Sequence, residues 1–502
     1  MTEVFLQAVV ALLSPATLMF LIGGVLIGLV FGVIPGLGGT TALALLLPLT
    51  FGMEVVHAFA MAGGIMGAVA MGGSISAILL NAPGTAPSAA TCLDGYPLAK
   101  QGRAAYAIGA VASASPLGGL FGVLTLLLVL PVAKEVVLLF GPPEFFLVAV
   151  FGIVTVAVSS SRNLLRGLIA GGIGLMLSFV GYDTVNGGVR FSFGSEFLWD
   201  GIPLIPALVG LFGMAEMLRL SIAGGSVATD VSNVNLSGVG SGIRATLKHW
   251  RVVIRGSIIG TLIGAVPGVG GTVATFVAYS TTKKADRDPD SFGSGRIEGV
   301  VAPESANNAK DSGALLPTLA FGIPGSAEMV VFLGILMLHG MQPGPAIFAE
   351  HQQDIYGLIL ALTLGAFFAS IIGLIFVRWL AAITLVNGQI LAPVVIAVSF
   401  VGVYAINQTP GDIVVAAALG VVGYLMLRFD YPRLPLVIAL ILGETAERGF
   451  QQSMMIGKGD WGIFLHSATS LILVGLIVLS IGWSLVPLLR QRGTADETGA
   501  EK

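Results

Sequence analysis

The sequence has few charged residues and a single cysteine, and these shortages narrow the class of protein. Charged residues make up only 10% of the 502 positions, whereas hydrophobic residues make up 55%. A core surrounded by water cannot enclose that much apolar surface, so lipid must cover it. Cys92 stands alone, which excludes an internal disulfide and a metal cluster held by several thiolates.

Signatures of catalysis are also missing. The sequence has no H-E-x-x-H, no G-x-S-x-G and no lysine that would complete a phosphate-binding loop, and its five histidines are scattered. We therefore expect no enzymatic activity, no catalytic residue and no cofactor, and a membrane-embedded enzyme stays only as an alternative. No nucleic-acid partner is expected; the partner that this composition demands is the lipid bilayer.

Long apolar runs fill most of the chain. A window of about 18 to 20 residues picks out about eleven to thirteen candidate spans or half-spans. Clear examples are 20–34, 104–130, 146–158 and 355–377. These runs are apolar on all sides, unlike the alternating strands of a transmembrane barrel. The sequence predicts an all-α polytopic membrane protein.

Two apolar runs are interrupted in the same way, by IPGLGGT at 34–40 and by VPGVGGT at 266–272, a spacing of 232 residues. Proline lacks a backbone N–H and glycine tolerates any backbone angle, so each motif ends a helix and leaves N–H groups without partners. In lipid such backbone survives only where protein covers it or where it lines a wet cavity. The alternative is a packing kink, because Gly28 and Gly260 begin small-residue packing faces.

More of the second half matches the first. Residues 83–86 (PGTA) pair with 324–327 (PGSA) at a spacing of 241, and 203–208 (PLIPAL) pair with 435–440 (PLVIAL) at 232. Several matches in the same order indicate a duplicated unit. The expected domains are membrane repeat 1 at 1–223, an inter-repeat linker at 224–243, membrane repeat 2 with a C-terminal helix at 244–489, and a polar tail at 490–502.

Basic residues indicate how the repeats are oriented. Lys100 corresponds to an acidic region around Asp354, whereas Lys283 and Lys284 correspond to 51–57, which holds no lysine or arginine. Because basic loops stay in the cytoplasm, the two repeats are predicted to have inverted topologies. The arms beside VPGVGGT span only about 16 to 21 Å against about 30 Å of hydrocarbon. We therefore expect re-entrant or broken helices that meet near the bilayer midplane.

Helix N-termini at such breaks suit a carboxylate, because free N–H groups and the positive end of the helix dipole both attract negative charge. Hydroxyl and amide side chains beside the breaks add donors, and exposed carbonyls can coordinate a cation. The predicted substrate-binding residues are Gly36, Gly38, Gly39, Thr40, Thr41, Asn81, Gly84, Thr85, Gly268, Gly270, Gly271, Thr272, Gly325 and Ser326.

A polar segment, APESANNAKDSGALLP, lies just before the second PGxA break. Polar and charged side chains in that position are costly in lipid, so we expect them to have a function. Asn307, Asn308 and Asp311 are the candidates for ion coupling. The coupling ion would be Na+ or H+, and no metal site is expected beyond a transported Na+. The alternative is a solvated helix start that Glu304 and Asn307 cap.

Long motifs carry a resemblance to a known family: PGLGGT with LNAPGTAPSAATCLDGYPLAKQGRA, and PGVGGT with APESANNAKDSGALLPTLAFGIPGS and HGMQPGP. Over about residues 22–458 the chain resembles the large membrane subunit of the bacterial tripartite tricarboxylate transporters. The resemblance implies ion-coupled, secondary active uptake of an organic di- or tricarboxylate such as citrate. It also implies a small membrane subunit, a periplasmic solute-binding protein that delivers substrate, and a multi-pass place in the bacterial inner membrane. An anion-conducting channel stays as an alternative, since channels also line pores with irregular backbone.

Overall fold

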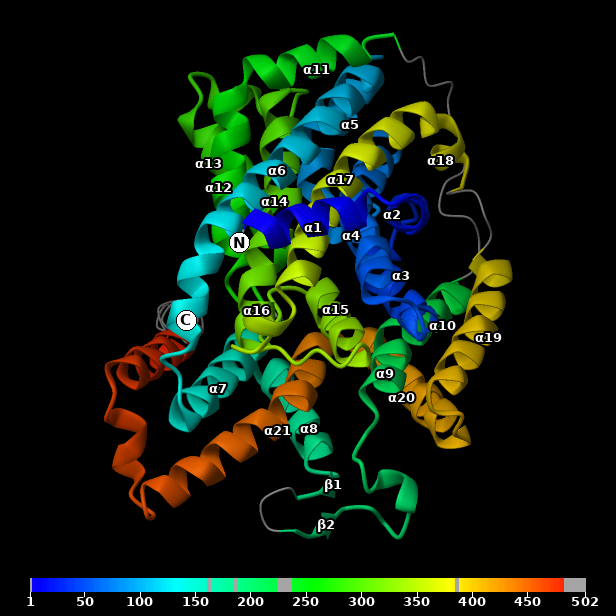
Figure 1. The fold of residues 1–502 in the computed structure, drawn as a ribbon. Coiled ribbons are helices and arrows are strands. Elements are labelled where there is room, and N and C mark those ends of the chain that lie inside the picture. Colours follow the sequence, from blue (N-terminus) through cyan, green and yellow to red (C-terminus); the bar gives the residue numbers. More distant parts are fainter. Residues whose placement is uncertain (1, 160–163, 184–186, 224–236, 384–387, 483–502) are drawn as a thin grey trace, which may run out of the picture. The chain divides into compact units, whose positions relative to one another are not determined.

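A computed structural model describes residues 2–159, 164–183, 187–223, 237–383 and 388–482. Helices dominate these ranges (Figure 1), and seven of the helices are long and apolar enough to cross a membrane. Six further apolar helices are shorter. The prediction of an all-α polytopic membrane protein is confirmed for this part of the chain.

The chain divides into two compact units, and each unit is assembled from two separate stretches of sequence. Unit 1 comprises residues 1–134 and 205–424, and unit 2 comprises residues 135–204 and 425–502. Each unit therefore draws on both halves of the chain. The predicted tail at 490–502 lies outside the described residues, as does most of the predicted linker, whose last residues begin a helix at Val239.

Unit 1 contains both PGxGG breaks. The helices of its first stretch are α1 (Thr2–Leu12), α2 (Pro15–Val33), α3 (Gly38–Leu46), α4 (Val55–Leu80), α5 (Ala89–Lys100) and α6 (Ala104–Val137), with short 3-10 turns at Leu47–Thr50 and Ala86–Ser88. The second stretch holds α9 (Leu204–Leu208), a π-helical segment (Val209–Met214), α10 (Ala215–Ala223), α11 (Val239–Lys248), α12 (Trp250–Gly264), α13 (Gly270–Ala285), a 3-10 turn (Pro289–Ser291), α14 (Glu298–Phe321), α15 (Ala327–Leu338), α16 (Ile347–Glu350), α17 (Gln352–Ile375), α18 (Val377–Ile383), α19 (Gly388–Asn407) and α20 (Pro410–Arg428).

Helices α4 and α14 are buried over most of their length within unit 1. Small residues let a neighbouring helix approach each of them closely. A Cβ on Gly28 of α2 would lie 2.6 Å from the carbonyl oxygen of Ile65 in α4, and a Cβ on Gly260 of α12 would lie 2.4 Å from that of Ala306 in α14. The glycines are 232 residues apart and their partners 241, so the spacings of the sequence matches recur in the packing.

Unit 2 is smaller and also mainly helical. It contains α7 (Pro142–Ser159), α8 (Leu164–Ser178), α21 (Arg433–Ile456), an apolar helix at Ala468–Gly482, 3-10 turns at Glu196–Leu198 and Trp461–Leu465, and the strands β1 (Gly181–Tyr182) and β2 (Val189–Arg190). The strands pair antiparallel, with Gly181 opposite Arg190. Arg190 ties this hairpin to α21, since its guanidinium donates to Glu447 Oε1 at 2.6 Å and Oε2 at 2.8 Å.

Candidate functional site

Both PGxGG motifs break a helix, as the sequence predicts. Helices α3 and α13 each begin inside the motif, after the turn that ends α2 or α12. The backbone φ angle is +91° at Gly36 and +74° at Gly268, and it is +59° at Gly38 and +75° at Gly270. Residues with a side chain rarely adopt such angles. The two turns therefore share positive φ angles at equivalent positions, and glycine is required at the same places in both.

The N-termini that follow the breaks have no side-chain cap. Leu37 precedes α3 and Val269 precedes α13, and neither side chain can accept a hydrogen bond. The first-turn N–H groups therefore remain available to a ligand. Thr41 is buried beside the first tip, and Thr40 and Thr272 are half-buried. A groove of about 420 Å³ follows α13 from its first turn to its C-terminal end.

The second pair of breaks is also equivalent in the two halves. Asn81 follows the last residue of α4 and has φ +54°, and Gly322 follows the last residue of α14 and has φ +69°. The Thr85 hydroxyl shares a 2.9 Å hydrogen bond with the Ser88 hydroxyl. Ser326 caps α15, because its Oγ accepts from the N–H three residues further on at 3.3 Å.

Gly84 and Gly325 lie in tight contacts between backbone segments. A Cβ on Gly84 would stand 1.8 Å from the carbonyl oxygen of Gly32, at the end of α2. A Cβ on Gly325 would stand 2.4 Å from the carbonyl oxygen of Gly264, at the end of α12. These two glycines therefore hold each second break against the first break of the same half.

Each PGxGG tip contacts a side chain from the other half of the chain. A Cβ on Gly39 would lie 2.6 Å from Glu328 Oε1, whereas one on Gly271 would lie 2.3 Å from Lys310 Cδ and 3.0 Å from Pro87 Cγ. Pro87 and Glu328 are 241 residues apart, so they occupy equivalent places in the two halves. The tips thus make reciprocal contacts, and charged side chains lie between them.

A charged cluster joins the two tips. Lys310 Nζ donates to Asp311 Oδ1 at 2.5 Å and to Glu328 Oε2 at 3.4 Å. The Lys310 and Asp311 side chains are each 6% exposed, and that of Glu328 is 18% exposed. Asp311 belongs to the predicted ion-coupling set, whereas Lys310 and Glu328 are absent from the predicted site. The signal that could have found Lys310 is its place in a segment aligned with apolar residues of the first half.

The polar residues of α14 are not a solvated helix start. Glu304 is fully buried in the seventh position of the helix, and its Oε1 accepts hydrogen bonds from Ser74 Oγ at 2.6 Å and from Thr91 Oγ1. Asn307 is 2% exposed, and its Nδ2 has no hydrogen-bond partner. The capping alternative is therefore wrong, because these side chains point into the protein rather than toward helix N–H groups.

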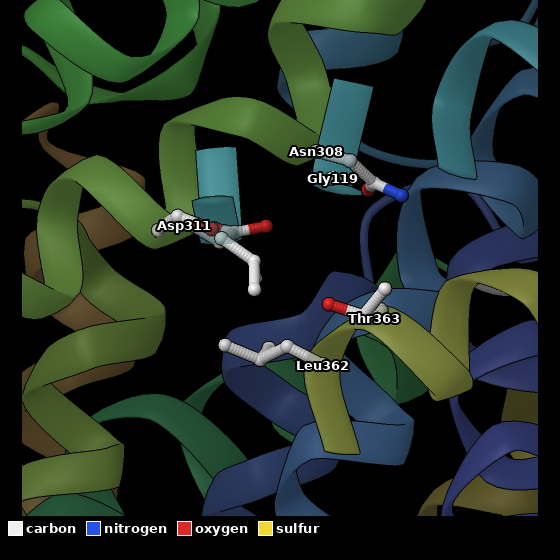
Figure 2. Close-up of a pocket in the computed structure, with 8 residues that line it drawn as sticks. Gly119, Asn308, Asp311, Leu362 and Thr363 are labelled. Carbon is white, nitrogen blue, oxygen red and sulfur yellow. The ribbon is translucent and has the colours of Figure 1, made fainter. Parts of the chain in front are cut away.

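A small cavity lies beside this face of α14 (Figure 2). It has a volume of about 10 Å³, and Asn308, Asp311, Gly119 and Thr363 are among the residues that line it. Asn308 is 5% exposed, yet neither its Oδ1 nor its Nδ2 has a hydrogen-bond partner. A buried amide normally has partners, so a polar species that fits the cavity would be stabilised there.

A second cation reaches the first tip. Arg219 Nη2 donates to the carbonyl oxygen of Gly36 at 3.4 Å, and its Nε donates to Glu216 Oε1 at 2.7 Å. The sequence gives no hint of this contact, because Arg219 lies far along the chain from the motif. One basic side chain therefore accompanies each tip: Arg219 at the first and Lys310 at the second.

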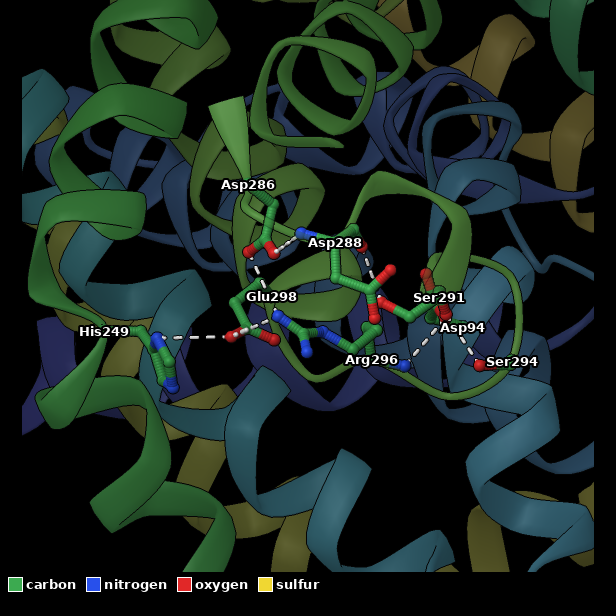
Figure 3. Close-up of polar contacts among 8 residues, drawn as sticks. All are labelled: Asp94, His249, Asp286, Asp288, Ser291, Ser294, Arg296 and Glu298. Carbon is green, nitrogen blue, oxygen red and sulfur yellow. Dashed lines mark hydrogen bonds and ion pairs between the residues drawn. The ribbon is translucent and has the colours of Figure 1, made fainter. Parts of the chain in front are cut away.

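The loop between α13 and α14 is fixed by a carboxylate from the first half (Figure 3). Asp94 Oδ1 accepts hydrogen bonds from the backbone N–H groups of Gly293, Gly295 and Arg296 at 2.8 to 2.9 Å, and its Oδ2 accepts from the Tyr279 hydroxyl at 2.9 Å. Asp94 is fully buried. This anchor fixes the position of the N-terminal end of α14, the helix that carries Lys310 and Asp311.

The same loop carries an ion-pair network. The Arg296 guanidinium contacts Asp286 at 3.0 Å and Glu298 at 3.2 Å, and His249 lies 3.5 Å from Glu298. The backbone N–H of Asp288 and the positive charge of Arg296 lower the pKa of Asp286. The network therefore favours the ionised form of Asp286 and joins α11, α13 and α14 at one end.

The helices and their paired breaks define a polytopic membrane protein with a polar site inside its helical core. A sequence model of the family described as "Tripartite tricarboxylate transporter TctA family" matches residues 18–438, and the chain belongs to this family. The resemblance carried by the PGxGG and PGxA motifs is thereby confirmed. The protein is a tricarboxylate transporter component.

Two curated proteins of Agrobacterium vitis are similar to the chain. An uncharacterized 52.8 kDa protein in the TAR-I ttuC′ 3′ region is 34% identical over 493 residues, which cover 96% of this chain and 95% of the relative. An uncharacterized protein in the TAR-II ttuC′ 3′ region is 31% identical over 234 residues, which cover 46% of this chain and 96% of that relative. No solved structure matches the chain.

Proposed function

We propose that this chain is the large membrane subunit of a secondary active importer, which uses an ion gradient to carry an organic di- or tricarboxylate across the bacterial inner membrane. The observation that carries the proposal is the pair of PGxGG breaks. Each break has glycines at positive φ, an uncapped helix N-terminus and a basic side chain beside it. N-terminal N–H groups together with a cation are suited to bind a carboxylate.

The repeats have inverted topologies in this proposal. The recurrence of the same glycine contacts at spacings of 232 and 241 residues supports a duplication. A parallel duplication would produce the same recurrence, but the alternation of basic loops favours the inverted arrangement. Helices α12 and α13, with 15 and 16 residues, reach about 22 to 24 Å, less than a hydrocarbon core of about 30 Å. This shortness supports re-entrant helices whose tips lie near the midplane.

Substrate binds between the tips, at the predicted glycines and threonines of the two PGxGG motifs, and the coupling ion binds at the polar face of α14. Of the other predicted residues, Gly84 and Gly325 pack the second breaks against the first. The N–H groups at 38–41 and 270–272 face the carboxylates, while Asn307, Asn308 and Asp311 serve the coupling Na+ or H+. No cofactor is involved.

The partners in the proposal are a small membrane subunit and a periplasmic solute-binding protein. The family name describes a tripartite transporter, which supports two further components besides this chain. An anion channel is the second candidate, because it too would line its path with free N–H groups. The charged cluster favours a transporter, since a salt bridge that closes the space between the tips is suited to alternating access rather than continuous conduction.

The test uses the purified membrane complex in proteoliposomes, with the binding protein added outside. A thermal-shift screen of the complex and binding protein against organic acids selects the ligand. Uptake of citrate, isocitrate, succinate and malate, here called the acid panel, is then measured under imposed Na+ and H+ gradients. Accumulation above the outside concentration supports the importer, whereas equilibration without a gradient supports the channel.

A further inference from the structure

Three charged side chains meet between the tips, and their charges do not balance. Lys310 Nζ lies 2.5 Å from Asp311 Oδ1 and 3.4 Å from Glu328 Oε2. One ammonium group therefore faces two carboxylates in a place shielded from water. An uncompensated charge in such a place is costly, so the arrangement favours the binding of a second cation nearby.

A place for that cation lies directly beside Asp311. The cavity that Asn308, Asp311, Ser312 and Thr363 help to line has room for about one water-sized particle (Figure 2). Asn308 lines this space, and its buried amide has no hydrogen-bond partner. The Thr363 hydroxyl donates its proton to the carbonyl oxygen of Ile359 at 3.3 Å, so its oxygen can still accept a cation.

These groups suit Na+ better than a proton. A proton needs only one basic atom, and neither an amide oxygen nor a hydroxyl takes up a proton near neutral pH. A hard metal cation instead binds carboxylate, amide and hydroxyl oxygens at once. The unpartnered Asn308 amide beside Asp311 therefore indicates a metal cation rather than protonation alone.

The stem of Lys310 lies on the second tip. A Cβ on Gly271 would come within 2.3 Å of both Cδ and Cε of Lys310, so only glycine leaves room for this side chain. At the same place the N-terminus of α13 lacks a side-chain cap. An ammonium group and a helix N-terminus are both positive, and a carboxylate bound here would neutralise both.

We propose that Lys310 binds a carboxylate of the substrate and that Na+ controls whether Lys310 is available. Without Na+, Asp311 and Glu328 hold the ammonium group. Na+ in the cavity takes the place of Lys310 at Asp311, and Lys310 then turns to the substrate at 270–272. The inference rests on the proposed function and makes Na+ and substrate bind cooperatively, each raising the affinity for the other by the same factor.

The test compares the wild type with the double variant Lys310→Met/Glu328→Gln. This variant removes one positive and one negative charge, so the net charge of the cluster is unchanged and Asp311 keeps its carboxylate. Two quantities are measured on purified protein in nanodiscs: the rise in unfolding temperature that Na+ causes, and the binding of the radiolabelled acid from the panel that the wild type accumulates. The matched control is Arg166→Met/Asp430→Asn, which removes an exposed ion pair in unit 2.

The double variant should lose about tenfold to a hundredfold in affinity for the acid, because it lacks the charge-assisted hydrogen bond of Lys310. It should nevertheless respond to Na+ at a lower concentration than the wild type, since Lys310 no longer competes for Asp311. Asn308→Ala should instead lose the response to Na+. The control should behave as the wild type in both measurements.

Acid binding by the double variant at wild-type affinity would overturn the inference, because Lys310 would then only neutralise its neighbours. A wild type that Na+ does not stabilise, or an Asn308→Ala variant that responds as the wild type does, would overturn the Na+ site and the inference with it. The proposed function fails in a different way: the wild type would then accumulate no acid of the panel under any imposed gradient.

Discussion

A Cβ at residue 84 would stand 1.8 Å from the carbonyl oxygen of Gly32, so Gly84 allows the second break of the first half to lie directly on the end of α2. Gly325 and Gly264 repeat this relationship at 2.4 Å in the second half. In each half, the PGxA break can approach the PGxGG break closely only because a glycine, Gly84 or Gly325, has no side chain at the contact.

We expect Gly84→Ala and Gly325→Ala to destabilise the protein, because a methyl group would force the two backbone segments apart. Overpacking of this kind costs about 1 to 3 kcal/mol. The unfolding temperature of the purified protein should fall for both variants. Gly23→Ala is the control, since a Cβ at Gly23 has nothing within 4 Å. Equal unfolding temperatures for all three variants would contradict the packing role.

Topology can be tested with single cysteines in a Cys92→Ala background. Lys100→Cys and Lys284→Cys should be protected from an impermeant thiol reagent added to whole cells, because their loops are predicted to be cytoplasmic. Gln353→Cys, beside Asp354, and Pro410→Cys, beside Asp412, should react, because these loops are predicted to be periplasmic. Residues 353 and 410 lack nearby lysine and arginine residues. Residue 410 is labelled in place of Asp412 because Asp412 is too buried to react. Labelling of residues 284 and 410 from the same side would rule out the inverted arrangement.

Asp94→Ala should loosen the loop that precedes α14. The substitution leaves three backbone N–H groups and the Tyr279 hydroxyl without their acceptor, and each hydrogen bond to a charged group contributes about 1.5 to 3 kcal/mol. The free energy of unfolding should therefore fall by several such increments, and trypsin should cleave near Arg296 faster than in the wild type. Asp290→Ala, in the same loop but exposed, is the control. Unchanged proteolysis at Arg296 would show that Asp94 does not anchor the loop.

Asp311→Asn tests the ion site. The amide keeps the shape of the side chain but removes the charge that both Lys310 and a cation would use. We expect the dependence of uptake on Na+ or on pH to change, while the amount of protein in the membrane stays close to that of the exposed control Glu350→Gln. If uptake by the variant depends on Na+ and pH as the wild type does, Asp311 has no part in ion coupling.

The sequence predicts the breaks because their cause is local. A proline followed by two spaced glycines sets the backbone angles at 36 and 38, and again at 268 and 270, whatever surrounds them. The duplication can also be seen in the sequence, because matching segments occur in the same order in both halves. These features recur in the structure at the predicted positions.

The charged cluster depends on contacts that no local pattern records. Glu328 lies beyond a second break, and only the folded chain brings it back to Lys310. In the first half, Val69 and Pro87 hold the places of Lys310 and Glu328. Comparison of the halves therefore marks Lys310 as unusual but does not show that Glu328 is its partner. Arg219 reaches Gly36 across a longer separation, 183 residues against 18 for Lys310 and Glu328. Charge pairs of this kind follow from packing and are read from the structure.

The central claim is that the two PGxGG tips form the carboxylate site, and its most direct measurement is the uptake of the transported acid by Gly38→Ala and Gly270→Ala in proteoliposomes. A Cβ at Gly270 meets nothing within 4 Å and one at Gly38 only Thr85 Cγ2 at 3.8 Å, so the strain comes from the positive φ angles rather than from packing. Both variants should insert and assemble, yet show an apparent affinity about tenfold to a hundredfold weaker, equivalent to one lost charge-assisted hydrogen bond. Gly28→Ala and Gly260→Ala, on the packing faces, should reduce the amount of folded protein first. Normal uptake by the tip variants, or failure only because the protein is missing from the membrane, would contradict the claim.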